Sequence, residues 1–421
     1  SGGAEEETAG LLCYINTSAT SGQSKLVPVK RAMFKCMDDG VFELLSDIVG
    51  GSDTVTLHNS VTLPLHNLYR GEAVAMHSHG AGQPLKITSA SMLQALNATG
   101  NKVTSVCLYL PVLRELLQQC KESGVRLPQL RAIGTAGAEI HPRLYAQVVE
   151  IAPNAEVVGM YACTEVMPIS IVTLGPALAA QSLAEQGLGI LVGKPSLCEC
   201  KVLTDFSLGA AAVAQPYGRL AFRGVHVCPP IGERSGNDTH DEWYCNGDVG
   251  WMDASGCVYY MGRYADIVHF SSGVAIPAVA VESVALFDPR LKACALLPLP
   301  EGRGLLLCTL TASVEFDEVR ELALERLSRS VWSDGVRGLI TFAEYRAAAE
   351  LPVDARHGAK LQRALLRRQL ASGRLRVTGN VCIAGQRSTL WRAGVEMLYA
   401  CREKLAGKRK ATDGRCEDPF V

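Results

Sequence analysis

The sequence predicts an α/β protein in which a large amino-terminal domain of layered sheets and helices precedes a smaller α+β domain. Short apolar runs alternate with helical patterns from Leu11 to about Gly262. Repeated strand, loop and helix units of this kind build a sheet covered by helices. The composition then changes around 262–266, and a shorter set of strands and helices follows.

The elements can be placed in order along the chain. An apolar strand at 103–110 leads through Pro111 into a helical pattern of Leu113, Leu116, Leu117 and Cys120. A strand at 130–133 precedes the loop Gly134–Gly137, Pro142 begins the next helix, and a strand at 157–158 runs into another loop. Later we expect strands at 293–297, 305–310 and 339–342 and a helix at 317–331. The predicted domains are 1–262 and 263–370, with a partly disordered tail at 371–421.

Composition excludes several classes of function. The 41 basic and 42 acidic side chains give a formal charge of −1, so no positive field attracts nucleic acid. No apolar run reaches the roughly 18 residues of a membrane-spanning helix. The 15 cysteines among 421 residues fall well below the roughly 8–10% of disulfide scaffolds. We therefore expect a cytoplasmic protein without a transmembrane segment, and the oligomeric state stays open.

The segment Asn16–Lys25 combines five hydroxyl side chains, a glycine and a lysine after an apolar strand. Backbone N–H groups and hydroxyls of such a loop can surround phosphate oxygens, and the lysine adds a positive charge. The Gly-Lys-Ser/Thr of a Walker A loop is missing. A Ser/Thr-rich surface turn would explain the segment alone equally well.

The loop resembles the phosphate-binding signature of the acyl-adenylate-forming enzymes, which include acyl-CoA synthetases, luciferases and peptide-synthetase adenylation domains. It departs from that signature at Ala19, Ser21 and Ser24. The resemblance implies that ATP phosphates are bound here by Thr17, Ser18, Thr20, Ser21, Gly22 and Lys25.

Further motifs follow in the family's order. Leu63–His66 resembles the segment that borders the acyl pocket, which implies that His66 binds substrate. Gly134–Ala138 resembles the loop that flanks adenine, through Gly137 and Ala138.

Two more motifs would complete the nucleotide site. Tyr161–Glu165 is similar to Tyr-Gly-x-Thr-Glu, with Ala162 in place of glycine. The resemblance implies that Tyr161 stacks on adenine, Thr164 contacts phosphate and Glu165 holds Mg²⁺. It also implies that Asp248, after Tyr244–Gly247, binds both ribose hydroxyls and that Arg263 reaches the nucleotide.

The last two motifs concern the smaller domain. Gly262–Asp266 resembles the hinge on which that domain pivots, but Ala265 occupies the pivot position where the family has Asp or Lys. Leu351–Arg363 resembles the closing motif, whose Lys360 bridges the acid and the α-phosphate. The implied catalytic residues are thus Lys360, Thr164 and Glu165. Ala359 before the lysine, where acyl-CoA synthetases usually have glycine, is more similar to the bacterial β-lactone synthetases of olefin biosynthesis.

The resemblance implies an acid ligase that uses ATP and Mg²⁺ to convert a carboxylic acid, most simply a fatty acid, into an acyl-adenylate. Ligation to CoA is the first expectation for the second step. A β-lactone synthetase acting on a 3-hydroxy fatty acid is one alternative, and a non-catalytic nucleotide-binding relative is another, motivated by Ala19, Ala162 and Ala265. The subdomain that the family places before its phosphate loop is expected to be missing.

Overall fold

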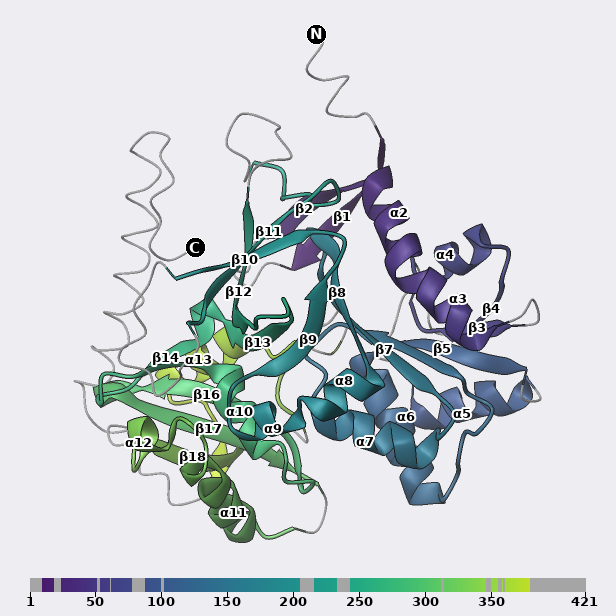
Figure 1. Ribbon diagram of the computed structural model, residues 1–421. Helices are drawn as coiled ribbons and strands as arrows, with labels where there is room; N and C mark the ends of the chain where they lie inside the picture. The colour runs from purple at the N-terminus through teal and green to yellow at the C-terminus, as the bar shows by residue number, and fades with distance from the viewer. Residues whose placement is uncertain are drawn as a thin grey trace.

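Two sheets of unequal size organise the fold (Figure 1). The computed structural model describes residues 10–18, 24–50, 54–60, 62–77, 88–99, 102–204, 216–232, 243–311, 314–345, 350–354, 358 and 360–378. Thr20, Ser21 and Gly22 of the predicted phosphate loop therefore lie outside the described residues.

The large sheet has 11 strands and is mixed. Its strands, in spatial order, are β10 (Glu199–Leu203), β11 (Gly218–Arg223), β12 (Tyr244–Met252), β13 (Val258–Arg263), β9 (Ile190–Pro195), β8 (Val166–Thr173), β7 (Glu156–Cys163), β6 (Ala132–Ala136), β5 (Val103–Tyr109), β3 (Val55–His58) and β4 (Ala73–Met76). The strands from β7 to β4 are parallel to one another, and those from β10 to β7 are antiparallel. The predicted α/β class is confirmed.

Helices cover both faces of the parallel half of this sheet. They are α2 (Arg31–Met37), the π-helical turn η1 (Asp38–Phe42), α3 (Glu43–Val49), α4 (Pro64–Tyr69), α5 (Ser89–Ala98), α6 (Leu110–Ser123), α7 (Pro142–Ile151), α8 (Leu174–Ala179) and α9 (Gln181–Glu185). Neighbouring strand residues point to opposite faces. Ile133 and Val157 pack with α6 and α7, whereas Ala132 and Val158 pack with η1 and α3. Figure 1 shows the two helical layers on either side of the strands.

Helix α6 illustrates how the sequence sets an element. Pro111 lies in its first turn, where the missing N–H costs nothing, and Gly124 ends it at φ +68°. Its predicted apolar positions Leu113, Leu116 and Leu117 are all buried.

Two strands differ from the sequence expectation. Strand β6 spans Ala132–Ala136, so Gly134 and Thr135 belong to the strand and not to a loop. They do so because pairing with β5 continues to Ala136. Strand β7 likewise continues to Cys163, because it forms a hairpin with β8 whose turn is Thr164–Glu165.

The amino-terminal hairpin consists of β1 (Leu11–Ser18) and β2 (Ser24–Lys30), paired in antiparallel register. Val27 of β2 packs with Met33 and Cys228. The backbone N–H of Cys228 in turn donates to the Glu165 carbonyl at 2.7 Å. Cys228 thus contacts both the amino-terminal hairpin and the Thr164–Glu165 turn.

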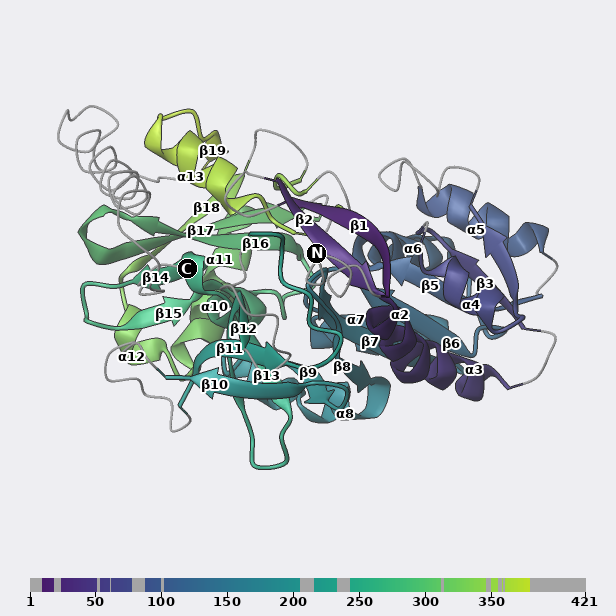
Figure 2. The same cartoon turned by 90° about the horizontal axis from the view of Figure 1, so that it is seen from above.

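The second sheet lies in the carboxy-terminal part of the chain, beside the large sheet (Figure 2). Its order is β16 (Leu291–Leu299), β17 (Arg303–Leu310), β18 (Ile340–Tyr345) and β19 (Val377–Thr378). Around it lie the short turn η3 (Tyr264–Asp266), the hairpin β14 (Ile267–His269) and β15 (Ala275–Pro277), α10 (Ala278–Ala285), the turn η4 (Pro300–Gly302), α11 (Phe316–Ser328), α12 (Ser333–Val336) and α13 (Arg363–Ala371). The sheet extends past the expected domain end at residue 370, since Leu375 is buried and β19 pairs with β18.

Candidate active site

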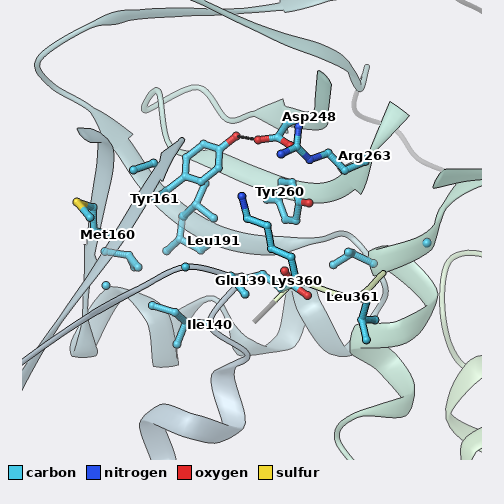
Figure 3. A pocket seen from close by; sticks show the side chains of 18 of the residues that line it. Glu139, Ile140, Met160, Tyr161, Leu191, Asp248, Tyr260, Arg263, Lys360 and Leu361 are labelled. Carbon is cyan, nitrogen blue, oxygen red and sulfur yellow. Dashed lines mark hydrogen bonds and ion pairs between the residues drawn. The ribbon is translucent and has the colours of Figure 1, made fainter. Parts of the chain in front are cut away.

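A pocket opens where the carboxyl ends of β6 and β7 face strands β12 and β13 and the segment 360–363 (Figure 3). This is the edge at which open α/β sheets commonly bind ligands. The pocket is lined by Gly137, Ala138, Glu139, Ile140, Gly159, Met160, Tyr161, Ala162, Val172, Leu191, Val192, Asp248, Tyr260, Arg263, Asp266, Ala278, Val279, Lys360, Leu361 and Arg363. Six residues predicted from five separate motifs meet here: Gly137, Ala138, Tyr161, Asp248, Arg263 and Lys360.

Asp248 is the polar centre of the pocket and is only 4% exposed. Its Oδ2 accepts hydrogen bonds from the Tyr161 hydroxyl at 2.5 Å and from Asn246 Nδ2 at 2.7 Å, and its Oδ1 pairs with Arg263 Nε at 2.9 Å. A carboxylate offers about four acceptor positions. A ribose diol would therefore compete with Tyr161 and Asn246 for the same oxygens.

Burial and the charge of Asp248 set the protonation states of Tyr161 and Arg263. Burial and the neighbouring carboxylate raise the pKa of the Tyr161 phenol well above its ordinary range. The Asp248 charge also raises the pKa of Arg263, which donates to the Asn246 carbonyl as well. Tyr161 is thus a neutral hydrogen-bond donor, and Arg263 is a permanent cation in the pocket lining.

Lys360 enters the pocket from the carboxy-terminal part of the chain, and Figure 3 shows its ammonium group directed toward Tyr161 and Asp248. A tight turn holds its backbone: its N–H donates to Asp354 Oδ1 at 2.8 Å, and its carbonyl accepts from the Asp354 N–H at 2.9 Å. Three residues on, Arg363 donates to both Glu282 oxygens at 2.5 and 2.7 Å and pairs with Asp266 at 3.3 Å. These bonds anchor the turn and leave the lysine side chain exposed.

One wall of the pocket is apolar. It consists of Ile140, Met160, Val172, Leu191, Val192 and Val279 together with the backbone of Gly159. A Cβ on Gly159 would lie 2.6 Å from Ile140 Cδ1 and 2.8 Å from the Tyr145 hydroxyl, so a larger residue would require these side chains to shift. This wall suits a hydrocarbon group.

The other predicted residues lie outside the pocket lining. Thr17, Ser18 and Lys25 belong to the amino-terminal hairpin, where the Thr17 hydroxyl donates to the Lys25 carbonyl at 3.4 Å. Thr164 and Glu165 form the half-buried turn between β7 and β8. The structure thus joins the predicted adenine, ribose and closing-motif residues in one pocket, whereas the described residues predicted to bind phosphate are not part of its lining.

His66 occupies an unexpected environment. It is 5% exposed, on α4, and its ring is stacked between Phe34 at 4.0 Å and Phe42 at 4.5 Å. Burial lowers its pKa from about 6.5 to about 4, so the ring is neutral. Its Nδ1 lies 3.8 Å from Asp38. It does not line the pocket, and its role in substrate binding stays a prediction.

Sequence reasoning assigned no role to three charged residues of the pocket: Glu139, Asp266 and Arg363. Asp266 and Arg363 lie inside the recognised motifs, and that place in the sequence is the signal that could have identified them as pocket residues. Glu139 follows Ala138 directly, but its neighbours Arg114, Glu282 and Arg363 come from distant parts of the chain. Burial raises the pKa of its carboxyl group.

The pocket agrees with the outcome of comparisons with known proteins. The sequence profile described as AMP-binding enzyme matches residues 5–230, just over half of the chain. The chain belongs to the AMP-binding enzyme family.

Two relatives show the range of this family. The 4-coumarate--CoA ligase-like 4 of Oryza sativa subsp. japonica is 25% identical over 294 residues, which cover 68% of this chain and 50% of that protein. The olefin beta-lactone synthetase of Xanthomonas campestris pv. campestris is 25% identical over 275 residues, 59% of this chain and 48% of that protein. The chain spans about half the length of these curated relatives.

A solved structure confirms the AMP-binding fold. O-succinylbenzoate coenzyme A synthetase from Bacillus subtilis, in complex with ATP and magnesium ion, superposes with a TM-score of 0.59 at 21% identity. The match covers 84% of this chain and 69% of that protein.

Two observations concern metals and membranes. Within the described ranges, no three His, Cys, Asp or Glu side chains are grouped to hold a metal ion, and the assignment of Mg²⁺ to Glu165 stays a prediction. Among the same residues, none of the helices has the length and apolar character needed to span a bilayer.

Proposed function

We propose that this chain activates a carboxylic acid with ATP, giving an acyl-adenylate and pyrophosphate. The convergence of Tyr161, Asp248, Arg263 and Lys360 in one pocket is the observation that carries the proposal. These residues come from four separate motifs and supply a stacking ring, a diol acceptor and two cations.

The chemistry needs little more than positioning and charge stabilisation. The acid's oxygen attacks the α-phosphorus, the bond to the β-phosphate oxygen breaks, and pyrophosphate leaves. Asp248 would orient the ribose, and Lys360 would neutralise charge shared by the acid and the α-phosphate. Thr164 would contact phosphate, and Glu165 would hold Mg²⁺, which supplies Lewis-acid stabilisation when bound.

We propose that the acid carries a hydrocarbon chain, because the apolar wall from Ile140 to Val279 offers no polar side chain to a polar substrate. Two acceptors are then possible for the acyl group. CoA is the acceptor named for several relatives. A hydroxyl group on the acid itself is the second candidate, favoured by Ala265 at the pivot position and by the resemblance of the Lys360 segment to β-lactone synthetases.

The test is pyrophosphate release from ATP with a panel of fatty and 3-hydroxy fatty acids. Lys360→Ala should reduce release by about 10²-fold or more, as loss of one charge-stabilising group does, while the melting temperature stays within about a degree because the side chain is exposed. ATP binding without pyrophosphate release from any acid would instead support a non-catalytic relative.

A further inference from the structure

The carboxylate of Asp248 is nearly saturated with hydrogen bonds from the protein itself. Its Oδ2 accepts from the Tyr161 hydroxyl at 2.5 Å and from Asn246 Nδ2 at 2.7 Å, and its Oδ1 pairs with Arg263 Nε at 2.9 Å. A carboxylate has about four acceptor positions, so about one remains open. A ribose brings two neighbouring hydroxyl donors. If both are to bind Asp248, one of the three protein donors has to release its position.

Arg263 is the donor least able to leave. Asp248 is only 4% exposed, and Arg263 is the cation that faces it. The guanidinium also donates to the Asn246 carbonyl, so a second bond holds it in the same place. Withdrawal of one partner from a buried ion pair is strongly unfavourable because it leaves an uncompensated charge. Arg263 therefore stays on Oδ1 when a ligand enters.

Asn246 is bound to Asp248 twice within one tight turn. Its Nδ2 donates to Asp248 Oδ2, and its own Oδ1 accepts the backbone N–H of Asp248 at 2.9 Å. This is an Asx turn, in which an asparagine side chain binds the backbone two residues further on. Gly247 between them has φ +84°, a conformation that favours glycine. Because the amide group is planar, Nδ2 stays on Oδ2 for as long as Oδ1 keeps the backbone N–H.

The Tyr161 hydroxyl is held less firmly. A phenol has one O–H to donate, and Figure 3 shows Tyr161 of β7 reaching toward Asp248 of β12 to donate it. The half-buried ring has tilted or edge contacts with Tyr260 at 6.0 Å and Phe222 at 6.4 Å between ring centroids. A neutral hydroxyl that leaves Asp248 can exchange its bond for one to water in the pocket. Tyr161 is therefore the donor that a ribose can replace.

We propose that the Tyr161 hydroxyl occupies a ribose position on Asp248 in the nucleotide-free protein and is displaced when the ribose binds, while Asn246 keeps the carboxylate oriented. The inference rests on the proposed binding of ATP and adds an internal competitor to it. This competition makes the site selective for ribose, because only a sugar with its own hydroxyl donors replaces the bond that Tyr161 gives up. A nucleotide without these hydroxyls leaves Tyr161 on Asp248.

The test compares ATP with 2′,3′-dideoxy-ATP, which lacks both ribose hydroxyls. Dissociation constants are measured by equilibrium binding without any acid, so no turnover is needed. Tyr161→Phe keeps the ring and removes the competing donor, so the ribose then supplies a hydrogen bond that the Asp248 carboxylate lacks. We expect the Kd for ATP to fall about tenfold, in the range of a hydrogen bond to a charged group. The Kd for the dideoxy nucleotide should stay unchanged.

Tyr259→Phe is the matched control. Tyr259 precedes Tyr260 on β13, its hydroxyl donates to Asp253 Oδ2 at 3.4 Å, and neither Tyr259 nor Asp253 belongs to the described pocket lining. This variant removes the same kind of bond outside the pocket and should leave both dissociation constants unchanged. An unchanged or higher Kd for ATP in Tyr161→Phe, or an equal change for both nucleotides, would overturn the proposal.

Asn246 provides a second readout as a positioning residue. Asn246→Ala should raise the Kd for ATP about tenfold and leave that for the dideoxy nucleotide unchanged. Asn246→Thr should restore part of the loss, because a threonine hydroxyl forms the same kind of turn. Tighter ATP binding by Asn246→Ala, beside unchanged binding by Tyr161→Phe, would show that Asn246 is the displaced donor and would refute our assignment.

The two proposals fail in different ways. ATP binding that follows the expected pattern without pyrophosphate release from any acid would refute the proposed adenylation and support the displacement of Tyr161. Pyrophosphate release together with equal dissociation constants for the wild type and Tyr161→Phe would refute the displacement alone. Absence of ATP binding to every variant would refute both.

Discussion

Asp248 is expected to contribute both to the stability of the folded protein and to its selectivity for ATP over 2′-deoxy-ATP. The variant Asp248→Asn tests both contributions. The change keeps the size of the side chain and removes the charge that faces Arg263 Nε at 2.9 Å. Breaking a fully buried ion pair costs roughly 3–5 kcal/mol. The Arg263 side chain is 25% exposed, and asparagine keeps one oxygen acceptor, so we expect about 2 kcal/mol. At about 2.1 cal/mol/K of unfolding entropy per residue, this lowers the Tm of the 421-residue chain by roughly 2–3 °C.

Selectivity should fall in parallel. If Asp248 binds the ribose diol, wild type prefers ATP to 2′-deoxy-ATP, and losing the charged acceptor removes about 1.4 kcal/mol or more of that preference, about tenfold. The assay is pyrophosphate release with each nucleotide, beside thermal denaturation. Asp253→Asn is the matched control, because Asp253 lies in the same β12–β13 hairpin and accepts bonds from Ser255 and Cys257 outside the pocket. A lower Tm with unchanged nucleotide preference would refute the ribose role.

Three further outcomes follow from individual contacts. If the acid's own hydroxyl accepts the acyl group, Glu139, an acidic side chain of the pocket lining, would take the hydroxyl proton. Glu139→Gln should then slow β-lactone formation from the adenylate by about 10²-fold, as loss of a general base does, and leave KM for ATP unchanged; a raised KM alone would mean that Glu139 contacts the nucleotide. Burial lowers the pKa of His66 from about 6.5 to about 4, so below pH 6.5 the imidazole binds a proton in the unfolded chain but not in the folded protein. This group therefore leaves the free energy of unfolding unchanged above pH 6.5 and lowers it as the pH falls toward 4. The loss reaches about 3 kcal/mol, and urea unfolding of His66→Phe should show a correspondingly weaker pH dependence. Arg143→Ala should lower the rate of adenylation although Arg143 does not line the pocket, because Arg143 binds the carbonyls that follow α10. The control Arg126→Ala, which frees only the Glu150 carbonyl in the amino-terminal part of the chain, should leave that rate unchanged.

Local patterns predicted the elements that depend on local physics. The apolar spacing and Pro111 predicted α6 and the strand before it, and six residues that the motifs named line one pocket, where their individual roles stay predictions. The ends of β6 and β7 were wrong because strand length is set by pairing with partners distant in sequence. No spacing rule indicates whether Gly134 continues a strand, because that depends on what β5 does beside it.

The environment of His66 shows a different limit. Its motif gave a position along the chain, but the ring lies between Phe34 and Phe42, which precede it by 32 and 24 residues. Only the tertiary structure shows that the imidazole is enclosed and neutral. The same holds for Glu139, whose charged neighbours Arg114, Glu282 and Arg363 are spread over three helices.

A series of contacts that begins at helix α7 determines the position of Lys360. Arg143 of α7 binds the carbonyls that follow α10, and α10 carries Glu282. Glu282 accepts both Arg363 donors, and Arg363 follows the Lys360 turn by three residues. Each link is buried or ion-paired, so the lysine is placed by packing and not by a charge at the pivot. A small residue at 265 is therefore compatible with this orientation of the carboxy-terminal part of the chain, because the contacts that stabilise the orientation lie at Arg143, Glu282 and Arg363.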